Sequence, residues 1–183
     1  MAVRYNKNNL PNELYFVTFT ILGWRNIFVK NKYCSLVYKW FDYLKDNYNN
    51  EICAYVIMPN HVHVLIKLSN KSPLLPKVIQ NAKRFLAYQI IKLAEEDNRL
   101  DLLNFFSMNA KKKGGAKHKV FEDSYDSLII QSNKFFLEKL NYIHSNPCQE
   151  KWHLASDPED YKYSSASNYI LGKGEYEVCV IDF

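Results

Sequence analysis

The chain has 183 residues, a length typical of one domain with room for a substantial core. Hydrophobic residues make up 48% of it, which argues against a disordered protein, and its formal charge of +5 is compatible with a polyanionic partner without requiring one. We therefore expect a single domain over residues 1–183, with a polar arm at 1–12 and a C-terminal extension at 172–183.

The cysteines and the apolar runs exclude several classes of protein. The four cysteines are scattered, without a Cys-x-x-Cys pair, so no zinc ribbon is expected. The N-terminus does not resemble a secretory signal, and no apolar run reaches the roughly 18 residues that a membrane span needs. These features predict a cytoplasmic protein with reduced cysteines and no membrane contact.

The hydrophobic pattern predicts strands and helices along most of the chain. The expected elements are a strand at Leu14–Leu22, a helix at Asn31–Asn49, strands on either side of Pro59-Asn60, a helix at Pro73–Asp97, a short strand within Val120–Ile130, a helix at Asn133–Asn146, a short helix at Tyr161–Leu171 and a final strand at Tyr176–Ile181. This order predicts an α+β fold, a ferredoxin-like antiparallel sheet with helices packed on it.

Two connections carry their own expectations. Proline excludes a type I′ turn at Pro59-Asn60, so that connection is expected to be wider than two residues. Residues 98–119 contain several lysines and a Gly-Gly pair, which predicts a mobile basic loop able to follow a phosphate backbone or, equally, a solubilising insertion.

The strand after Asn60 carries the first chemical signal. Its aliphatic residues alternate and share one face, whereas His61 and His63 project together from the other face, roughly 6.5 to 7 Å apart along the backbone. Two neutral imidazoles at this spacing can converge on one divalent metal ion. The alternative is a pair of partly exposed polar residues with no ligand.

The late helix supplies a second signal. Phe136, Leu140 and Ile143 have the spacing of a packed stripe, and Tyr142 lies on another face, one turn before Asn146. A tyrosine hydroxyl is a poor nucleophile at neutral pH unless its target is activated, which a metal ion does by polarising a phosphoryl oxygen. The product would be a phosphotyrosine ester, whose reversal rejoins strands, so the pair of signals favours DNA nicking and strand transfer.

These residues resemble those of a known family. His61-Val62-His63 after Met-Pro-Asn resembles the histidine–hydrophobic–histidine (HUH) motif of the IS200-like single-tyrosine transposases, and Tyr142 to Pro147 resembles their catalytic helix in the form typical of REP-associated tyrosine transposases. The further matches, which extend the resemblance to roughly residues 14–171, are Phe16-Val17-Thr18-Phe19, Val120-Phe121 to Asp126, Pro158-Glu159-Asp160-Tyr161, Ser164-Ser165 and Tyr169.

The resemblance implies a metal-dependent single-stranded DNA endonuclease and strand transferase that forms a covalent 5′-phosphotyrosine intermediate. It implies Tyr142 as nucleophile and His61 and His63 as ligands of Mg²⁺ or Mn²⁺, although imidazole also accepts zinc. The expected partner is single-stranded or hairpin DNA, and the resemblance is compatible with both a monomer and a homodimer.

The third metal ligand departs from the family pattern. Related transposases have a glutamine four residues after the tyrosine, whereas this chain has the shorter amide of Asn146. His118, Glu122 and His144 are alternative ligands, although His144 is otherwise expected at the surface.

Basic side chains are the expected contacts of the DNA backbone, with salt-dependent binding and aromatic stacking on unpaired bases. The candidates are Lys83, Arg84, Lys111, Lys112, Lys113 and Lys117. The main alternative function is a domesticated, non-catalytic nucleic-acid-binding protein on the same scaffold; a metallohydrolase is disfavoured because further ligands near His61 and His63 in the sequence are lacking.

Overall fold

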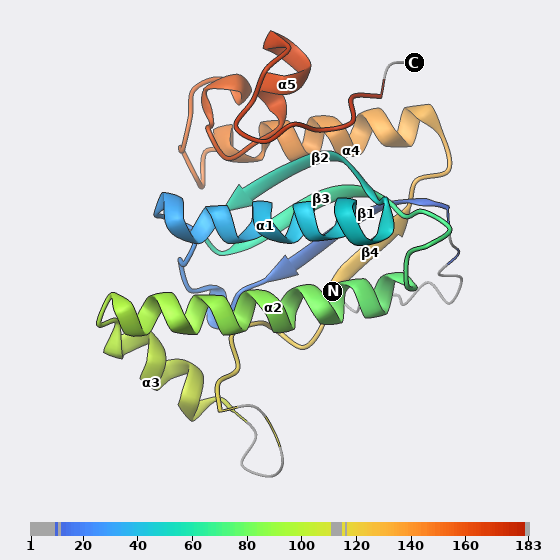
Figure 1. Ribbon diagram of the computed structural model, residues 1–183. Helices are drawn as coiled ribbons and strands as arrows, with labels where there is room; N and C mark the ends of the chain where they lie inside the picture. The colour runs from blue at the N-terminus through green and yellow to red at the C-terminus, as the bar shows by residue number, and fades with distance from the viewer. Residues whose placement is uncertain (1–9, 11, 111–114, 116, 182–183) are drawn as a thin grey trace.

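A four-stranded antiparallel sheet with strand order β2-β3-β1-β4 forms the centre of the computed structural model, which describes residues 10, 12–110, 115 and 117–181 (Figure 1). The elements are β1 (Leu14–Thr20), η1 (Leu22–Trp24), α1 (Asn31–Tyr48), β2 (Glu51–Met58), β3 (His61–Lys67), α2 (Leu75–Glu96), α3 (Leu100–Met108), β4 (Asp126–Ile129), α4 (Asn133–Ser145), η2 (Asn146–Cys148), η3 (Pro158–Asp160) and α5 (Ala166–Leu171). Helix α1 connects β1 to β2 and α2 lies between β3 and β4, so the predicted ferredoxin-like α+β fold is confirmed. Within the described ranges, no helix is both long and apolar enough to span a bilayer.

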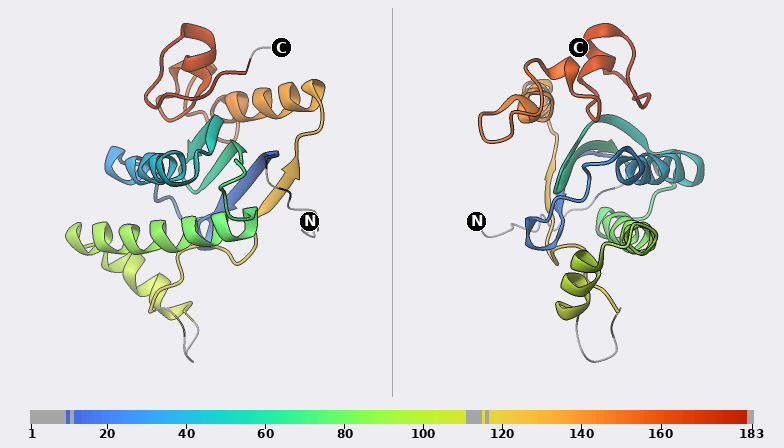
Figure 2. Two further views of the ribbon diagram at one scale, coloured as in Figure 1. Left: turned by 45° about the vertical axis from the view of Figure 1, so that its right-hand side comes forward. Right: turned by 90° about the vertical axis from the view of Figure 1, so that its left-hand side faces the viewer.

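The two faces of the sheet are covered by different helices (Figure 2). Val62, Val64 and Ile66 of β3 belong to the core beneath α1 and α2. Leu65 belongs to a second core, built with residues of α4 on the opposite face. Because side chains alternate along a strand, His61 and His63 project toward the α4 face, as the sequence pattern predicts.

The turn between β2 and β3 corrects one expectation. Met58 pairs with His61, so Pro59 and Asn60 form a two-residue connection rather than a wider one. Neither residue has a positive φ, which agrees with the exclusion of a type I′ turn. The carbonyl of Pro59 accepts hydrogen bonds from two backbone amides of the segment after η1, and these contacts compensate for the tight connection.

Helix α3 lies in the region that was expected to be a loop. Leu102 and Phe106, one turn apart, are buried where α3 packs against α2, and this tertiary contact stabilises a helix of only nine residues. The predicted basic loop is therefore wrong for residues 100–108. Lys111, Lys112 and Lys113 lie outside the described residues.

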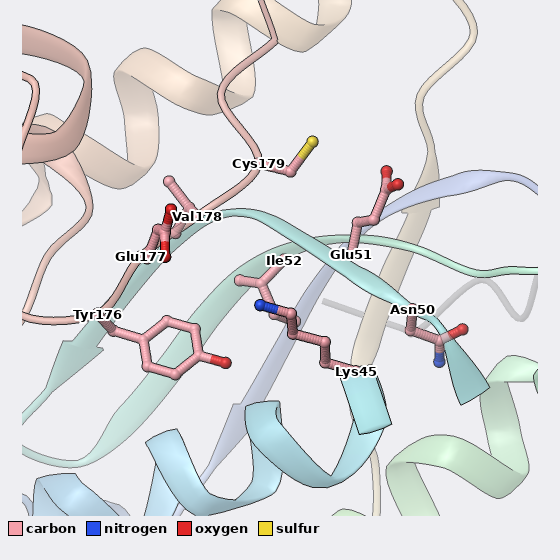
Figure 3. A pocket seen from close by; sticks show the side chains of 8 residues that line it. All are labelled: Lys45, Asn50, Glu51, Ile52, Tyr176, Glu177, Val178 and Cys179. Carbon is pink, nitrogen blue, oxygen red and sulfur yellow. The ribbon is translucent and has the colours of Figure 1, made fainter. Parts of the chain in front are cut away.

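The C-terminal segment follows the edge of β2 without forming the predicted strand. Cys179 donates its amide to the carbonyl of Ile52, and Tyr176 lies nearby over α1 (Figure 3). The middle of this edge is already occupied, because Ser165 bonds both the amide and the carbonyl of Tyr55 and the amide of Ile57 donates to Tyr163. The strand predicted at 176–181 is therefore wrong, and the helix predicted at 161–171 is shortened to α5.

Lys83 links α2 by hydrogen bonds to the segment that leads into β4. Its ammonium lies 2.9 Å from the carbonyl oxygen of Glu122 and 2.7 Å from that of Ser124. Burial lowers the pKa of Lys83 to about 8, against the opposing effect of nearby carboxylates, so the group is still mainly charged at pH 7.

We expect Lys83→Met to lower the free energy of unfolding by about 1–3 kcal/mol, because it removes the charged donor that bonds the carbonyls of Glu122 and Ser124. Lys92→Met on the exposed face of α2 is the matched control and should change stability by less than about 0.5 kcal/mol. Equal effects of the two substitutions in urea unfolding would show that the contacts of Lys83 are not stabilising.

His144 links α4 by a hydrogen bond to the segment that packs along β2. Its Nε2 lies 3.0 Å from Ser165 Oγ, its ring contacts Tyr169 at 5.2 Å between centroids, and only 8% of the residue is exposed. Burial lowers the pKa of His144 to about 4, so the folded protein holds it neutral.

This burial predicts a pH-dependent stability. Between about pH 6.5 and pH 4 the unfolded chain binds a proton at His144 that the folded protein does not, so stability is present above pH 6.5 and is lost on acidification, by up to about 3 kcal/mol for this residue. We expect His144→Gln to flatten the decline in unfolding free energy over that range. His153→Asn, at an exposed position, should retain the wild-type profile, and an unchanged profile for His144→Gln would contradict the prediction.

Candidate active site

Two strands and one helix bring the predicted site residues together. In the register of β1 and β3, Thr18 lies opposite His63 and Thr20 opposite His61. Helix α4 crosses this face of the sheet and packs through Phe136, Leu140 and Ile143, the stripe predicted from the sequence. Because that stripe faces the sheet, Tyr142 and Asn146 lie along the side of α4 that borders β3.

The two histidines face each other through their Nε2 atoms. These nitrogens are 3.0 Å apart, the ring centroids are 4.6 Å apart, and the residues are 6% and 4% exposed. The side chains thus converge on a single point rather than projecting in parallel into solvent.

Asn60 determines which nitrogen of His61 carries the proton. Its Nδ2 donates to the carbonyl oxygen of Trp24 at 3.3 Å, so its Oδ1 faces His61 and accepts from Nδ1 at 2.6 Å. A proton on Nδ1 leaves a lone pair on Nε2 of His61, the form that binds a metal ion. On His63, Nδ1 lies 2.6 Å from Thr18 Oγ1, a hydroxyl that can either donate or accept.

Both imidazoles are neutral at pH 7. Burial lowers the pKa of His61 to about 4, and the positive charge of Lys151 adds to this. Burial also lowers the pKa of His63 well below its usual range, with smaller contributions from His61 and Lys151. The pair is therefore ready to coordinate without first losing protons.

Tyr142 lies at the open edge of the pair. Its ring contacts His63 edge-on, with centroids 5.1 Å apart, and contacts Phe16 at 5.9 Å. The residue is 41% exposed, so solvent and a large substrate can reach it. The ring of Tyr142 therefore lies against His63 at a surface that solvent reaches.

Asn146 completes the cluster from the end of α4. It is 1% exposed, its Nδ2 lies 3.2 Å from His63 Nε2, and its Oδ1 has no hydrogen-bond partner. Three buried side-chain polar atoms lack a partner in the described part of the chain, and two of them, Asn146 Oδ1 and Trp152 Nε1, belong to residues that contact the histidine pair. Unpaired buried polar atoms of this kind call for an ion, a water molecule or a ligand.

The donor set fits a divalent ion. Two imidazole nitrogens converge, and a rotation of the Asn146 amide by 180°, which leaves its shape unchanged, turns an oxygen toward the same point. Among the described residues no group of three His, Cys, Asp or Glu side chains could hold a metal, so an amide oxygen is the third donor that this cluster offers.

The alternative third ligands are placed elsewhere. His144 is buried against Ser165, so its predicted surface position is wrong. The carboxylate of Glu122 accepts from the amide of Gly23, and His118 lines a hollow between α2 and residues 117–123.

The predicted DNA-binding residues do not join the histidines. Lys83, Arg84 and Lys117 line the hollow of about 820 Å³ beside α2, on the opposite side of the sheet from α4. The ammonium of Lys83 binds backbone carbonyls there, whereas Arg84 and Lys117 are exposed. The pocket of Figure 3, between α1, β2 and the C-terminal segment, is likewise separate from the site and includes neither histidine.

Four neighbours of the histidines were given no role from the sequence. Thr18 and Asn60 orient the rings, and Trp24 and Trp152 contact His61, with ring centroids 6.0 and 5.7 Å away. Asn60 directly precedes His61 in the sequence, and this adjacency predicts that the two residues are neighbours. The others become neighbours only through strand register and the packing of distant loops.

Comparison with known proteins gives the family. The sequence profile described as "Transposase IS200 like" matches residues 15–146. A search of curated proteins found no significant match.

A solved structure shows a similar fold. A REP-associated tyrosine transposase bound to a REP hairpin has a TM-score of 0.66 at 16% sequence identity, covering 100% of this chain and 95% of that chain. A provisionally assigned transposase from Deinococcus radiodurans R1 has a TM-score of 0.48 at 16% identity, covering 77% of this chain and 95% of that chain. Because the family profile spans well over half of the sequence, including His61, His63, Tyr142 and Asn146, the chain belongs to the IS200-like transposase family.

Proposed function

We propose that this transposase is a metal-dependent single-stranded DNA endonuclease and strand transferase that uses Tyr142 as its nucleophile. The observation that carries the proposal is the meeting of α4 and β3, where an exposed phenol and a buried amide border two neutral imidazoles whose Nε2 atoms are 3.0 Å apart. Family membership makes DNA transposition the context of this chemistry.

His61, His63 and Asn146 would hold the divalent ion, Mg²⁺ or Mn²⁺. Such an ion, when bound, polarises a phosphoryl oxygen and neutralises charge that develops on it. Asn60 and Thr18 hold the two imidazoles in orientation, because each bonds the Nδ1 atom that does not face the ion.

In the proposed step, the Tyr142 oxygen attacks the phosphorus of a phosphodiester and the bond from phosphorus to the 3′ oxygen breaks. The phenol proton is lost to solvent and the departing 3′ oxygen takes up a proton, leaving a 5′-phosphotyrosine ester and a free 3′ hydroxyl. Because the ester retains the energy of the broken bond, attack by a 3′ hydroxyl of another strand joins DNA and releases the tyrosine.

Hairpin DNA with unpaired flanks is the proposed partner. The similar REP-associated transposase was solved bound to a REP hairpin, and an unpaired strand can reach a phenol at the open edge of a site more readily than a duplex can. The alternative, a protein on this scaffold that binds DNA without cutting it, predicts binding with no covalent product.

We expect the wild-type chain to form a covalent adduct with labelled hairpin DNA carrying single-stranded tails of randomised sequence, in the presence of Mg²⁺ or Mn²⁺. On a denaturing gel the adduct should migrate with the protein. Tyr142→Phe should abolish it and still bind the DNA, because only the nucleophilic oxygen is removed.

Tyr88→Phe is the matched control, since Tyr88 is also an exposed helical tyrosine, and it should leave the adduct unchanged. An adduct that persists in Tyr142→Phe would refute the assignment of the nucleophile. Wild-type binding without any adduct would support the non-catalytic alternative.

Metal affinity provides a test that does not require turnover. We expect His63→Ala to abolish Mn²⁺ binding measured by electron paramagnetic resonance, because it removes a converging nitrogen. Thr18→Val, which keeps the shape but removes the partner of His63 Nδ1, should weaken it by about 10- to 100-fold. His153→Ala is the control, and wild-type affinity in His63→Ala would place the metal elsewhere.

A further inference from the structure

The 3₁₀ turn η1 places a tryptophan beside the histidine pair. The indole of Trp24 contacts His61 with ring centroids 6.0 Å apart and planes at 65°, yet 61% of the residue is exposed. Trp152 contacts the same imidazole, with ring centroids 5.7 Å apart. The site therefore has an exposed aromatic surface next to His61 and the phenol of Tyr142 next to His63.

Trp24 adopts a backbone conformation that its residue type disfavours. Its φ is +56°, in the left-handed region that bulky residues rarely enter. Exposure of a large apolar ring is also unfavourable, so neither local preference nor burial explains the position. Strained backbone conformations cluster at functional sites, so the conformation of Trp24 at the edge of the candidate site indicates a functional role.

Several contacts hold this conformation in place. The carbonyl of Trp24 accepts from Asn60 Nδ2, and the amide of Gly23 donates to Glu122 at 2.9 Å. Gly23 has a φ of +62°, and a Cβ there would lie 2.8 Å from the ring of Phe105, so the turn favours glycine at this position. Asn60 bonds both the main-chain carbonyl of Trp24 and the ring of His61, so the backbone at Trp24 is held beside the imidazole that the indole contacts.

We propose that Trp24 is a stacking platform for an unpaired base of the DNA strand, at a nucleotide next to the phosphodiester that Tyr142 attacks. The proposal rests on the proposed function for the location of that phosphodiester, and it adds a positioning contact on the His61 side of the site. Every base has a flat π face, so a tryptophan binds it without selecting sequence. Because hydrogen bonds hold the backbone of this turn, the platform is partly positioned before the strand binds, which lowers the entropic cost of ordering the strand.

The test measures binding of a fluorescein-labelled 20-nucleotide oligothymidylate by anisotropy, in EDTA and with every protein carrying Tyr142→Phe, so that no chemistry contributes. Loss of one base–aromatic stack corresponds to about 5- to 150-fold in affinity. We expect Trp24→Ala to weaken binding within that range and Trp24→Phe to restore most of it.

Two controls separate stacking from other causes. Leu171→Ala removes an apolar side chain of similar exposure, 56%, on α5 and should bind like the parent protein. On a strand of abasic sugar-phosphate units of equal length, Trp24→Ala and the parent should bind alike, because no base is present to stack. Thermal unfolding of each variant verifies that the fold is retained.

Unchanged affinity of Trp24→Ala for oligothymidylate would overturn the proposal, as would an equal loss on the abasic strand. These outcomes are distinct from failure of the proposed function. A covalent adduct with no effect of Trp24→Ala would leave the enzyme assignment intact and remove the platform. A Trp24-dependent, base-dependent affinity without any adduct would retain the platform on a protein that binds DNA without cutting it.

Discussion

The site depends on the burial of two imidazoles whose Nε2 atoms meet at 3.0 Å. Because Asn60 accepts a hydrogen bond from Nδ1 of His61, the Nε2 atom of His61 carries a lone pair. A lone pair on His63 Nε2 would be repelled by it at that distance. Two arrangements remove the repulsion: a proton on His63 Nε2 that is donated to His61, or a cation between the nitrogens. The hydroxyl of Thr18 is compatible with both, since it donates to His63 Nδ1 in the first and accepts from it in the second. The cluster can therefore exist with and without an ion while its buried nitrogens remain paired.

The position at which α4 ends determines which of its side chains lie at the histidine pair. A buried stripe holds one side of the helix against the sheet, and Pro147, in η2, prevents the α-helix from continuing beyond Asn146. Asn146 is consequently almost fully buried at the helix end, whereas Tyr142, one turn earlier, is 41% exposed. A single helix thus delivers a group suited to holding an ion and a group that a strand can reach. The side-chain nitrogen of Asn146 lies 3.2 Å from His63 Nε2, so this short amide reaches the histidine pair from the helix end.

Local periodicity predicted the parts of this arrangement that depend on single elements. Alternation along β3 assigned His61 and His63 to one face, and helical spacing separated Tyr142 from the packed stripe of α4. Features that depend on contacts distant in sequence were not predictable in this way. Helix α3 is stabilised by packing on α2, and the C-terminal segment fails to form a strand because Ser165 and Tyr163 already bond the edge of β2. The burial of His144 likewise results from Ser165, 21 residues away.

The two faces of the sheet are linked by contacts through one turn. Lys83 binds the carbonyl of Glu122, the carboxylate of Glu122 binds the amide of Gly23, and Asn60 joins Trp24 to His61. The basic hollow beside α2 and the histidine pair beneath α4 therefore share the residues that position η1. Glu122 bonds Lys83 through its carbonyl and Gly23 through its carboxylate, so the position of the turn η1 depends on the same segment that lines the hollow beside α2.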